Sequence, residues 1–429
     1  MRSDWKEYKL ADIANYISLK RDMKNITLNN YISTENILPD KGGITISSKL
    51  PSVNKVNSFK IGDTLFSNIR TYFRKVWYST FNGGVSNDVL VIRSRDINIL
   101  DSKYLYYLLS NEKFIQYTVQ TAKGTKMPRG DKTAIMNYSL FLPSLQTQKK
   151  IAHILSTLDN KIELNRKTDQ TLEKMAQTIF KSWFIDFDPV KAKAKEGDSE
   201  TIARELGISQ EILELFPNEF VDSEMGLIPK GWEISTIEKE VSIFGGATPR
   251  TKESKYWKNG KNHWATPRDL SKLSTKILID TDRKITEEGV KKISSKQLPI
   301  GTILLSSRAP VGYIAYSTVP ISINQGFIAM VCNKRVSNYF IMYWLDVAMR
   351  EIKGRSEGTT FAEISKKAFR PIKLIVPSQN TLLVFDNYIK PMVEKIILNE
   401  KEIKKLQKTR DTLLPKLLSG ELNISKVNL

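Results

Sequence analysis

The chain has 429 residues, of which 41% are hydrophobic and 9% aromatic, so it is long enough for two to four domains and too apolar for a disordered chain. It has no apolar run of about 18 residues and no hydrophobic stretch in its first ten residues, so we expect no membrane span, no secretory signal and a cytoplasmic protein. Lys and Arg total 66 against 46 Asp and Glu, and this net charge of +20 favours nucleic acid as partner over acidic lipids or acidic proteins.

Residues 1–143 are predicted to form a mixed α/β module. Its β-rich runs alternate with glycine-containing turns, and a helical stretch at 102–119 precedes a last strand-like run, SLFLPS, at 139–144. The expected strands are ITISS at 44–48, TLFSNI at 64–69, KVWYST at 75–80 and VLVIRS at 89–94. This order indicates a domain that combines sheet and helix.

Residues 144–184 are predicted to form a long spacer helix. Its a and d positions, taken in alternating steps of three and four, stay on one face over about five heptads. They are Ile151, Leu155, Leu158, Ile162, Asn165, Asp169, Leu172, Ala176, Ile179 and Trp183. An unbroken helix of this span would be roughly 55 Å long, enough to hold two globular units well apart.

A charged linker and a second module follow. The linker, residues 185–230, contains the polar run KAKAKEGDSE and a short predicted helix at SQEILELF. Residues 231–377 repeat the order of the first module, with strands, then a helix at 337–352 and the strand-like run IKLIVPS. The expected strands are TILLSS at 302–307, YIAYST at 313–318 and FIAMVCN at 327–333. The two modules therefore share a plan while their surfaces differ.

Residues 378–423 repeat the spacer helix in the same register. A Pro-Ser step precedes each helix, at Pro143 and at Pro377, which gives an offset of 377 − 143 = 234. Each seam position is its counterpart plus 234, namely Phe385, Ile389, Met392, Ile396, Asn399, Ile403, Leu406, Arg410, Leu413 and Leu417. The repeated register favours two paired antiparallel helices over ordinary core packing. Pro391 interrupts the second helix, and we expect a kink or a break there.

Asn165 and Asn399 occupy the same seam position near the middle of each spacer helix. An antiparallel pairing about the midpoints would bring them within about one core layer of each other. A buried Asn typically fixes helix register at a cost in stability. We hypothesise that these two residues set the alignment of the spacer helices; the competing interpretation is that each lies at a frayed or exposed place.

The sequence has no recognisable catalytic or metal-binding pattern. It contains no Asn-Pro-Pro-aromatic string of an amino-methyltransferase, no glycine-rich cofactor turn and no GxxxxGK phosphate loop. His153, His263 and the single cysteine, Cys332, cannot build a zinc site, and one cysteine cannot form an internal disulfide. We therefore expect a chain that is not an enzyme by itself and that carries no metal and no cofactor.

Basic and amide side chains in the loops of both modules are the candidate DNA contacts, because they bind base edges and neutralise phosphates. In the first module they are Asn68, Arg70, Arg74, Lys75, Lys123, Lys126 and Arg129. In the second they are Arg250, Lys252, Arg268, Arg308, Asn324 and Gln325. The competing interpretation for each is an ordinary solvated side chain.

Several strings follow one another in an order that matches a known family. The first module contains NIRTYFRKVW and GGVSNDVLVI, and the linker contains SWFIDFDPV and FVDSEMGLIPKGWE. The second module begins with GGATPRTKESKYWKNGKNHWATPRDL, and the chain ends near LPKLLSGEL. Over nearly its whole length the chain resembles the specificity subunit of type I restriction-modification systems.

This resemblance implies an α+β fold: two mixed α/β target-recognition domains separated by two long antiparallel coiled-coil helices, with a pseudo-two-fold internal repeat. It also implies a subunit that reads a bipartite target in double-stranded DNA. Two modification subunits would carry S-adenosylmethionine and methylate adenine at N6. A motor-nuclease restriction subunit, using ATP and Mg, would join for cleavage.

Two other function classes are compatible with the composition. A basic coiled-coil protein that organises DNA without sequence preference would not distinguish a cognate duplex from a random one. A scaffold that binds membranes or acidic proteins would sediment with vesicles or fail to bind duplex DNA.

Overall fold

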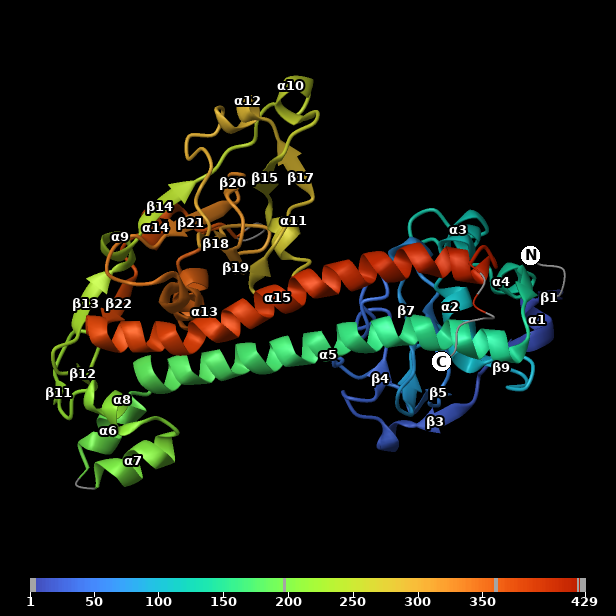
Figure 1. Ribbon diagram of the computed structural model, residues 1–429, viewed down its shortest axis with the longest axis horizontal. Helices are drawn as coiled ribbons and strands as arrows, with labels where there is room; N and C mark the ends of the chain where they lie inside the picture. The colour runs from blue at the N-terminus through green and yellow to red at the C-terminus, as the bar shows by residue number, and fades with distance from the viewer. Residues whose placement is uncertain (1–4, 196–197, 359–361, 423, 425–429) are drawn as a thin grey trace. The chain divides into compact units, whose positions relative to one another are not determined.

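The computed structural model describes residues 5–195, 198–358, 362–422 and 424 of the chain (Figure 1). The chain divides into two compact units: unit 1 contains residues 1–162 and 405–429, and unit 2 contains residues 163–404. This division cuts both long helices, so the two units differ from the five segments predicted from the sequence: two modules, two spacer helices and a linker. Residue 423, where the last predicted segment ends, lies outside the described residues. None of the described helices is long and apolar enough to cross a membrane.

Two four-stranded sheets form the centre of unit 1. Their strand orders are β2-β9-β6-β7 and β3-β5-β8-β4, and β1 pairs separately with β10. The strands are β1 (Lys6–Lys9), β2 (Ala14–Tyr16), β3 (Lys20–Asp22), β4 (Tyr31–Ile32), β5 (Lys55–Phe59), β6 (Thr64–Ser67), β7 (Val76–Tyr78), β8 (Gly83–Val85), β9 (Val89–Ser94) and β10 (Ser139–Leu142). β6 and β9 pair antiparallel and are almost wholly buried, and their apolar residues are consecutive: Leu65 and Phe66 in β6, and 89–92 in β9.

Short helices cover unit 1. They are α1 (Leu10–Ile13), α2 (Ser102–Leu109), α3 (Glu112–Gln120) and α4 (Lys132–Met136), with the 3₁₀ turns η1 (Met23–Asn25) and η2 (Thr71–Phe73). The Asp101 side chain caps α2 by accepting from the main-chain N–H groups of Lys103 and Tyr104. Asn111 caps α3 in the same way, so the predicted helical stretch at 102–119 is two helices rather than one.

Unit 2 repeats this arrangement. Its sheets have the orders β14-β21-β18-β19-β16 and β17-β15-β20, and the pairs β13-β22 and β11-β12 stand apart from them. The strands are β11 (Phe220–Val221), β12 (Ile228–Pro229), β13 (Glu233–Thr236), β14 (Ser242–Gly245), β15 (Asn262–Ala265), β16 (Ile277–Leu278), β17 (Arg283–Ile285), β18 (Ile303–Ser306), β19 (Ile314–Ser317), β20 (Ile321–Ile323), β21 (Phe327–Val331) and β22 (Lys373–Val376). The order β14-β21-β18-β19 is that of β2-β9-β6-β7, which confirms the internal repeat.

The helices of unit 2 include three in the predicted linker. They are α6 (Asp188–Lys193), α7 (Ser199–Leu206), α8 (Gln210–Glu214), α9 (Ile237–Glu240), α10 (Ser254–Trp257), α11 (Pro267–Leu270), α12 (Glu287–Val290), α13 (Asn338–Gly354) and α14 (Lys366–Phe369). α8 confirms the helix predicted at SQEILELF. α13 is the counterpart of α2 and α3, but it is continuous and its apolar face belongs to the main core of the unit.

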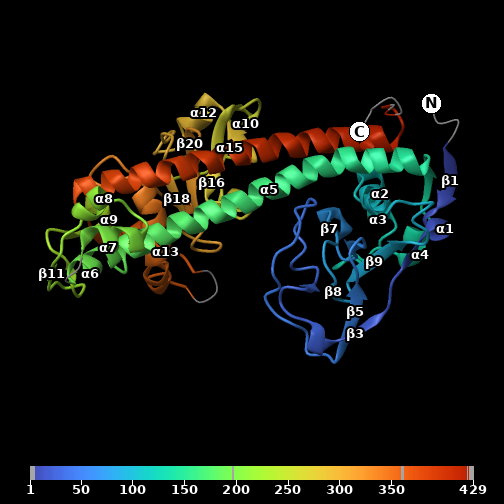
Figure 2. The ribbon, with the colours of Figure 1, turned by 60° about the horizontal axis from the view of Figure 1, so that its bottom comes forward.

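Two long helices, α5 (Leu145–Phe184) and α15 (Gln379–Leu418), pass through both units, and within each unit they lie side by side (Figures 1 and 2). Each begins after a serine whose hydroxyl accepts from the main-chain N–H three residues on: Ser144 from Thr147 and Ser378 from Thr381. All twenty predicted seam residues are buried or half-buried, as the heptad pattern predicts.

α15 continues through Pro391 without a break, because both Pro391 and Asn387, whose carbonyl loses its partner, lie on the exposed face where water can solvate that carbonyl. A kink at Pro391 stays a prediction. One prediction of local structure is wrong. ITISS at 44–48 is not a strand; Ile44 forms only an isolated bridge with Ile37. Ile46 is exposed there, so the alternating pattern buries no face of a sheet.

Candidate nucleic-acid interface

A β-hairpin loop after the helices of unit 1 docks on the end of strand β6. Lys123 and Arg129 close the loop by exchanging two main-chain hydrogen bonds, of 2.8 and 2.9 Å. The next residue, Gly130, donates its N–H to the carbonyl of Asn68 at 3.0 Å, and Arg70 donates its N–H to Pro128 at 2.8 Å. The loop 123–129 is thereby fixed beside the turn that follows β6.

Unit 2 contains the same arrangement with different side chains. Glu357 and Glu363 exchange two main-chain hydrogen bonds, of 3.0 and 2.9 Å, and Ile364 donates to the carbonyl of Ser307 at 3.0 Å. The offsets 357 − 123 and 363 − 129 are both 234, the value of the sequence repeat. Residues 359–361, within this loop, lie outside the described residues. The scaffold is thus conserved between the repeats, while basic residues in one loop are replaced by acidic residues in the other.

Arg70, Lys123, Lys126 and Arg129 come together at the loop of unit 1. The Arg70 guanidinium is 3.5 Å from the carbonyl of Lys126, a marginal hydrogen bond that leaves most of its donors available. Lys126 is exposed, while Lys123 pairs with Asp131 at 2.5 Å and Arg129 with Asp88 at 3.0 Å. These pairs are solvent-exposed and can exchange for phosphate at little cost.

The other three candidates of unit 1 are held by contacts within the unit. Arg74 binds Asp40 at 2.8 Å and Glu112 at 2.9 Å, and these hydrogen bonds raise the pKa of its guanidinium. Lys75 donates to the carbonyl of Thr34, and burial lowers the pKa of its ammonium group. Asn68 is only 7% exposed and lies beneath Gly130. Their contacts support the turn, which is a structural role.

The candidates of unit 2 gather where four chain segments meet at the ends of β14, β15, β18 and β20. The Ala247 N–H donates to Ile323, and the Asn324 N–H donates to Ala265, both at 3.0 Å. The Thr248 hydroxyl donates to Gln325 Oε1 at 2.7 Å. The segments carrying Arg250, Lys252, Arg268, Arg308, Asn324 and Gln325 therefore lie at one end of the sheets.

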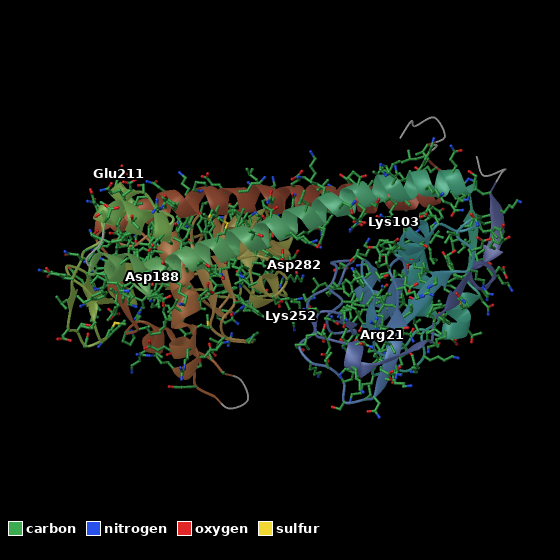
Figure 3. The ribbon with its side chains drawn as sticks, turned by 90° about the horizontal axis from the view of Figure 1, so that it is seen from below. Arg21, Lys103, Asp188, Glu211, Lys252 and Asp282 are labelled. Carbon is green, nitrogen blue, oxygen red and sulfur yellow. The ribbon has the colours of Figure 1, made fainter. Side chains whose placement is uncertain are left out.

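The charges in this part of unit 2 are only loosely paired. Arg308 is 3.5 Å from Glu363, and Arg250 is 3.9 Å from Glu253. Arg268 and Lys252 are exposed; Lys252 is labelled in Figure 3. The side-chain oxygen of Asn324 accepts a hydrogen bond from the N–H of Gly326, so its amide NH₂ is the group that can contact a ligand. Basic and amide groups on tight turns can bind phosphates and read base edges.

Gly246 allows the close approach of two of these segments. A Cβ at this position would lie 2.0 Å from the carbonyl oxygen of Ile323 and 2.5 Å from that of Asn324. We expect Gly246→Ala to destabilise unit 2 by roughly 2 kcal/mol, because the backbone must move apart. Thermal unfolding would show this as a lower midpoint, and Gly354→Ala, with open space at its Cβ, is the matched control. Equal midpoints for the two variants would contradict the close packing.

The comparisons with known proteins identify the family. The sequence model of the type I restriction modification DNA specificity domain matches residues 2–174 and 229–408. The chain belongs to this family. The type I restriction enzyme HindI specificity subunit of Haemophilus influenzae is 29% identical over 98% of this chain and 100% of its own length. The MjaIX specificity subunit of Methanocaldococcus jannaschii is 28% identical over 76% of this chain and 70% of its own.

A solved structure shares the fold of this specificity-domain chain. The type I restriction-modification S subunit from M. genitalium matches with a TM-score of 0.58 at 18% sequence identity, covering 96% of both chains. The likeness in structure therefore extends over both modules and both long helices. It confirms the predicted α+β class with its two modules and two long helices.

Sequence reasoning missed one of two corresponding turns in this specificity-domain chain. The turn before β9, residues 86–88, is the counterpart of 324–326, with an offset of 324 − 86 = 238. Its Asn87 accepts from Asn57 at 3.2 Å, and its Asp88 pairs with Arg129 of the hairpin loop. The place of the turn just before the last buried strand of each module was a signal that could have found it.

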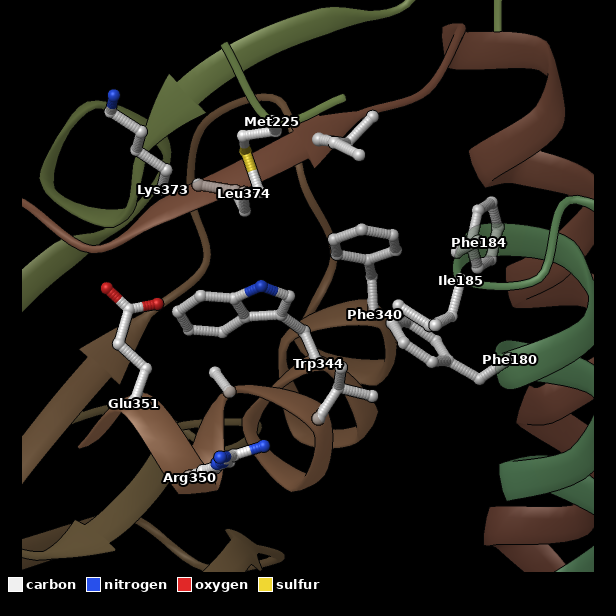
Figure 4. A pocket seen from close by; sticks show the side chains of 13 residues that line it. Phe180, Phe184, Ile185, Met225, Phe340, Trp344, Arg350, Glu351, Lys373 and Leu374 are labelled. Carbon is white, nitrogen blue, oxygen red and sulfur yellow. The ribbon is translucent and has the colours of Figure 1, made fainter. Parts of the chain in front are cut away.

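An apolar cavity of unit 2 lies elsewhere. It has a volume of about 460 Å³ and is lined mainly by apolar side chains of α5, α13 and β22. Phe180, Phe340 and Trp344 face it in Figure 4. None of the candidate contact residues lines this cavity, so the cavity belongs to the packing of the module on its helix.

Asn165 and Asn399 are both buried between the long helices, within unit 2. The Asn165 amide donates to Glu402 Oε2 at 2.8 Å, and the Asn399 amide donates to Asp169 Oδ1 at 2.6 Å. Each Asn thus binds an acid on the opposite helix. Neither lies at a frayed or exposed place.

Proposed function

We propose that this chain is the sequence-reading subunit of a type I restriction-modification complex, in which each module reads one half of a split target in double-stranded DNA. The observation that supports this most directly is the duplicated hairpin loop. Both loops have the same main-chain hydrogen bonds at the same offset, but one carries Lys123 and Arg129 where the other carries Glu357 and Glu363. One scaffold with two different sets of side chains suits a reader of two unlike half-sites.

The net charge of +20 supports a DNA partner. Binding to phosphates would release counterions, so affinity should fall steeply as salt concentration rises. Affinity from charge alone carries no sequence information, and we assign the reading of bases to Arg70, Lys126, Arg268, Arg308 and Gln325 at the two turn clusters. The chain would bind its DNA target in the cytoplasm, where the chromosome lies.

The chemistry would come from partner subunits. We propose that two modification subunits use S-adenosylmethionine to methylate adenine at N6, and that a restriction subunit uses ATP and Mg to translocate and cut DNA. This chain would decide where they act. We further propose that Asn165 and Asn399, with their acidic partners, fix the register of α5 against α15 and hence the gap between the half-sites.

The proposal predicts one split motif in the host genome. Methylome sequencing of the host strain and of a strain lacking this chain should show one bipartite motif with methylated adenine that is present in the first strain and lost in the second. The chain expressed without partners should methylate nothing. The DNA-organising alternative would be favoured if both strains had the same methylated motifs. It would also be favoured if the purified complex bound random and cognate duplexes with equal affinity.

A further inference from the structure

A buried lysine attaches each module to a long helix. Lys41 of unit 1 is 10% exposed, and its ammonium group lies 2.8 Å from Asp411 of α15. Lys276 of unit 2 is 15% exposed and pairs with Glu173 of α5. The offset, 276 − 41 = 235, differs by one residue from that of the repeat. Asp411 itself is 49% exposed, but separating either pair would leave an enclosed lysine ammonium without its counter-charge, whereas a pair exposed on both sides contributes little.

In unit 1, Lys41 connects the helix to the turn that follows Arg70. Asp40 donates its N–H to Phe73 at 2.9 Å, and Lys41 donates its N–H to Arg74 at 3.0 Å. Asp40 and Lys41 both have left-handed backbone conformations, with φ of 53° and 61°. Since L residues rarely adopt this conformation without support, the turn is held by its contacts. Movement at Lys41 would therefore be passed to the turn.

On the helix side, Asp411 is part of a charged network. Arg410 donates to Asp411 and also pairs with Asp159 of α5 at 2.8 Å. The hydroxyl of Tyr107 donates to the other oxygen of Asp159 at 2.6 Å. Within unit 1 the network thus joins Lys41 to both long helices.

In unit 2, the segment around Lys276 also contacts both long helices. Besides Glu173, Lys276 pairs with Asp346 of α13 at 3.0 Å. The hydroxyl of Thr275 donates to Glu400 of α15 at 3.0 Å. The carbonyl of Lys276 accepts from Tyr316 of β19, the strand that follows the turn carrying Arg308. A lysine thus links a long helix to the reading turn in unit 1 and to the strand after the reading turn in unit 2.

We propose that Lys41 and Lys276 are positioning residues that fix the angle at which each recognition module stands on the long helices, and hence the gap length that the complex accepts. This inference rests on the proposed function, because it assumes that each module reads one half-site. A rigid attachment penalises a duplex whose half-sites are one base pair too near or too far. A loosened attachment lets a module follow the displaced half-site.

The test compares methylation rates of the reconstituted complex on duplexes with the native gap and with the gap changed by one base pair. Lys41→Met and Lys276→Met keep most of the side-chain volume but lose the charge. We expect each to lower the ratio of native-gap to altered-gap rate by about fivefold or more, in line with coupling energies of neighbouring groups. Rates on the same preparation are compared, so a smaller folded fraction does not change the ratio.

Conservative and control variants separate positioning from loss of fold. Lys41→Arg, which keeps the charge facing Asp411, should restore the ratio. Lys55→Met is the matched control, since Lys55 forms an exposed pair with Asp22 at 3.7 Å. An unchanged ratio in both Met variants would overturn the inference. A wild-type complex without any gap preference would instead overturn the proposed function.

Discussion

Replacing Arg70 by alanine is expected to weaken recognition of one half-site by about 10- to 100-fold and to leave the other half-site unaffected, the range that one bidentate base contact contributes. Arg308→Ala should have the opposite selectivity. Both arginines lie on the turn after the central buried strand of their module, β6 or β18. Among the described residues, Arg308 forms a loose ion pair with Glu363, at 3.5 Å, and Arg70 contacts a main-chain carbonyl.

The measurement uses duplexes in which one half-site at a time is replaced. Relative affinity of the complex for each duplex, at fixed salt, gives the contribution of each module. Arg204→Ala, an exposed residue of α7, controls for the loss of one positive charge and should change affinity little and for both half-sites alike. Equal losses for both half-sites with Arg70→Ala would contradict two independent readers.

Asn399→Leu is expected to cause a large loss of stability in the helix pair. Asp169 is fully buried, and Asn399 donates to its Oδ1 at 2.6 Å, while no described residue donates a hydrogen bond to its Oδ2. Leucine would leave the carboxyl without this donor. Leaving the buried carboxylate without its hydrogen-bond donor should cost about 3 kcal/mol at pH 7.5. Thermal unfolding should show a midpoint lower by roughly 6 °C.

The loss should depend on pH. Burial raises the pKa of Asp169 to about 6, from the ordinary aspartate value of 3.8. The folded chain thus binds this proton more tightly than the unfolded chain, so the contribution of Asp169 to stability is most favourable below pH 3.8 and is lost as pH rises through about 6. The Asn399→Leu variant should therefore recover part of its stability at pH 5, where the carboxyl is protonated.

Two further variants make the comparison specific. Asn165→Leu is the same substitution at the repeated position, but its partner Glu402 is only half-buried and can turn to solvent, so a smaller loss is expected. Adding Asp169→Leu to Asn399→Leu removes the buried charge and should restore most of the midpoint. A pH-independent loss, equal for Asn165→Leu and Asn399→Leu, would show that the Asp169 carboxyl is not its cause.

Much of the fold was predictable because its signals are local. Buried strands such as β9, β18 and β21 are apolar along most of their length, and the heptad seam marks one face of each long helix. The helix break at Ser110 was not predicted, since the capping Asn111 competes with an otherwise continuous apolar pattern.

The candidate site was only partly predictable. All of its basic residues look alike in sequence, and tertiary structure divides them. Arg74 is neutralised by Asp40 and Glu112, which are 34 and 38 residues away, while Arg70 contacts the main-chain carbonyl of Lys126. Lys41, which the sequence did not single out, is committed to Asp411, 370 residues away. Pairing of charges depends on how distant segments close on each other, and no local pattern reports it.

The sequence by itself determined that this protein is a duplicated α+β chain with two heptad helices and a basic surface, because periodicity and composition record which faces are buried. Only the tertiary structure decided which polar groups face solvent and which are tied to the helices. The heptad spacing places Asp169 on the helix seam, and the tertiary structure makes it the buried partner of Asn399. The physical reason is that the spacing of nearby apolar residues shows which face of a helix or strand is buried. The environment of a charged group, in contrast, depends on segments that can lie hundreds of residues apart.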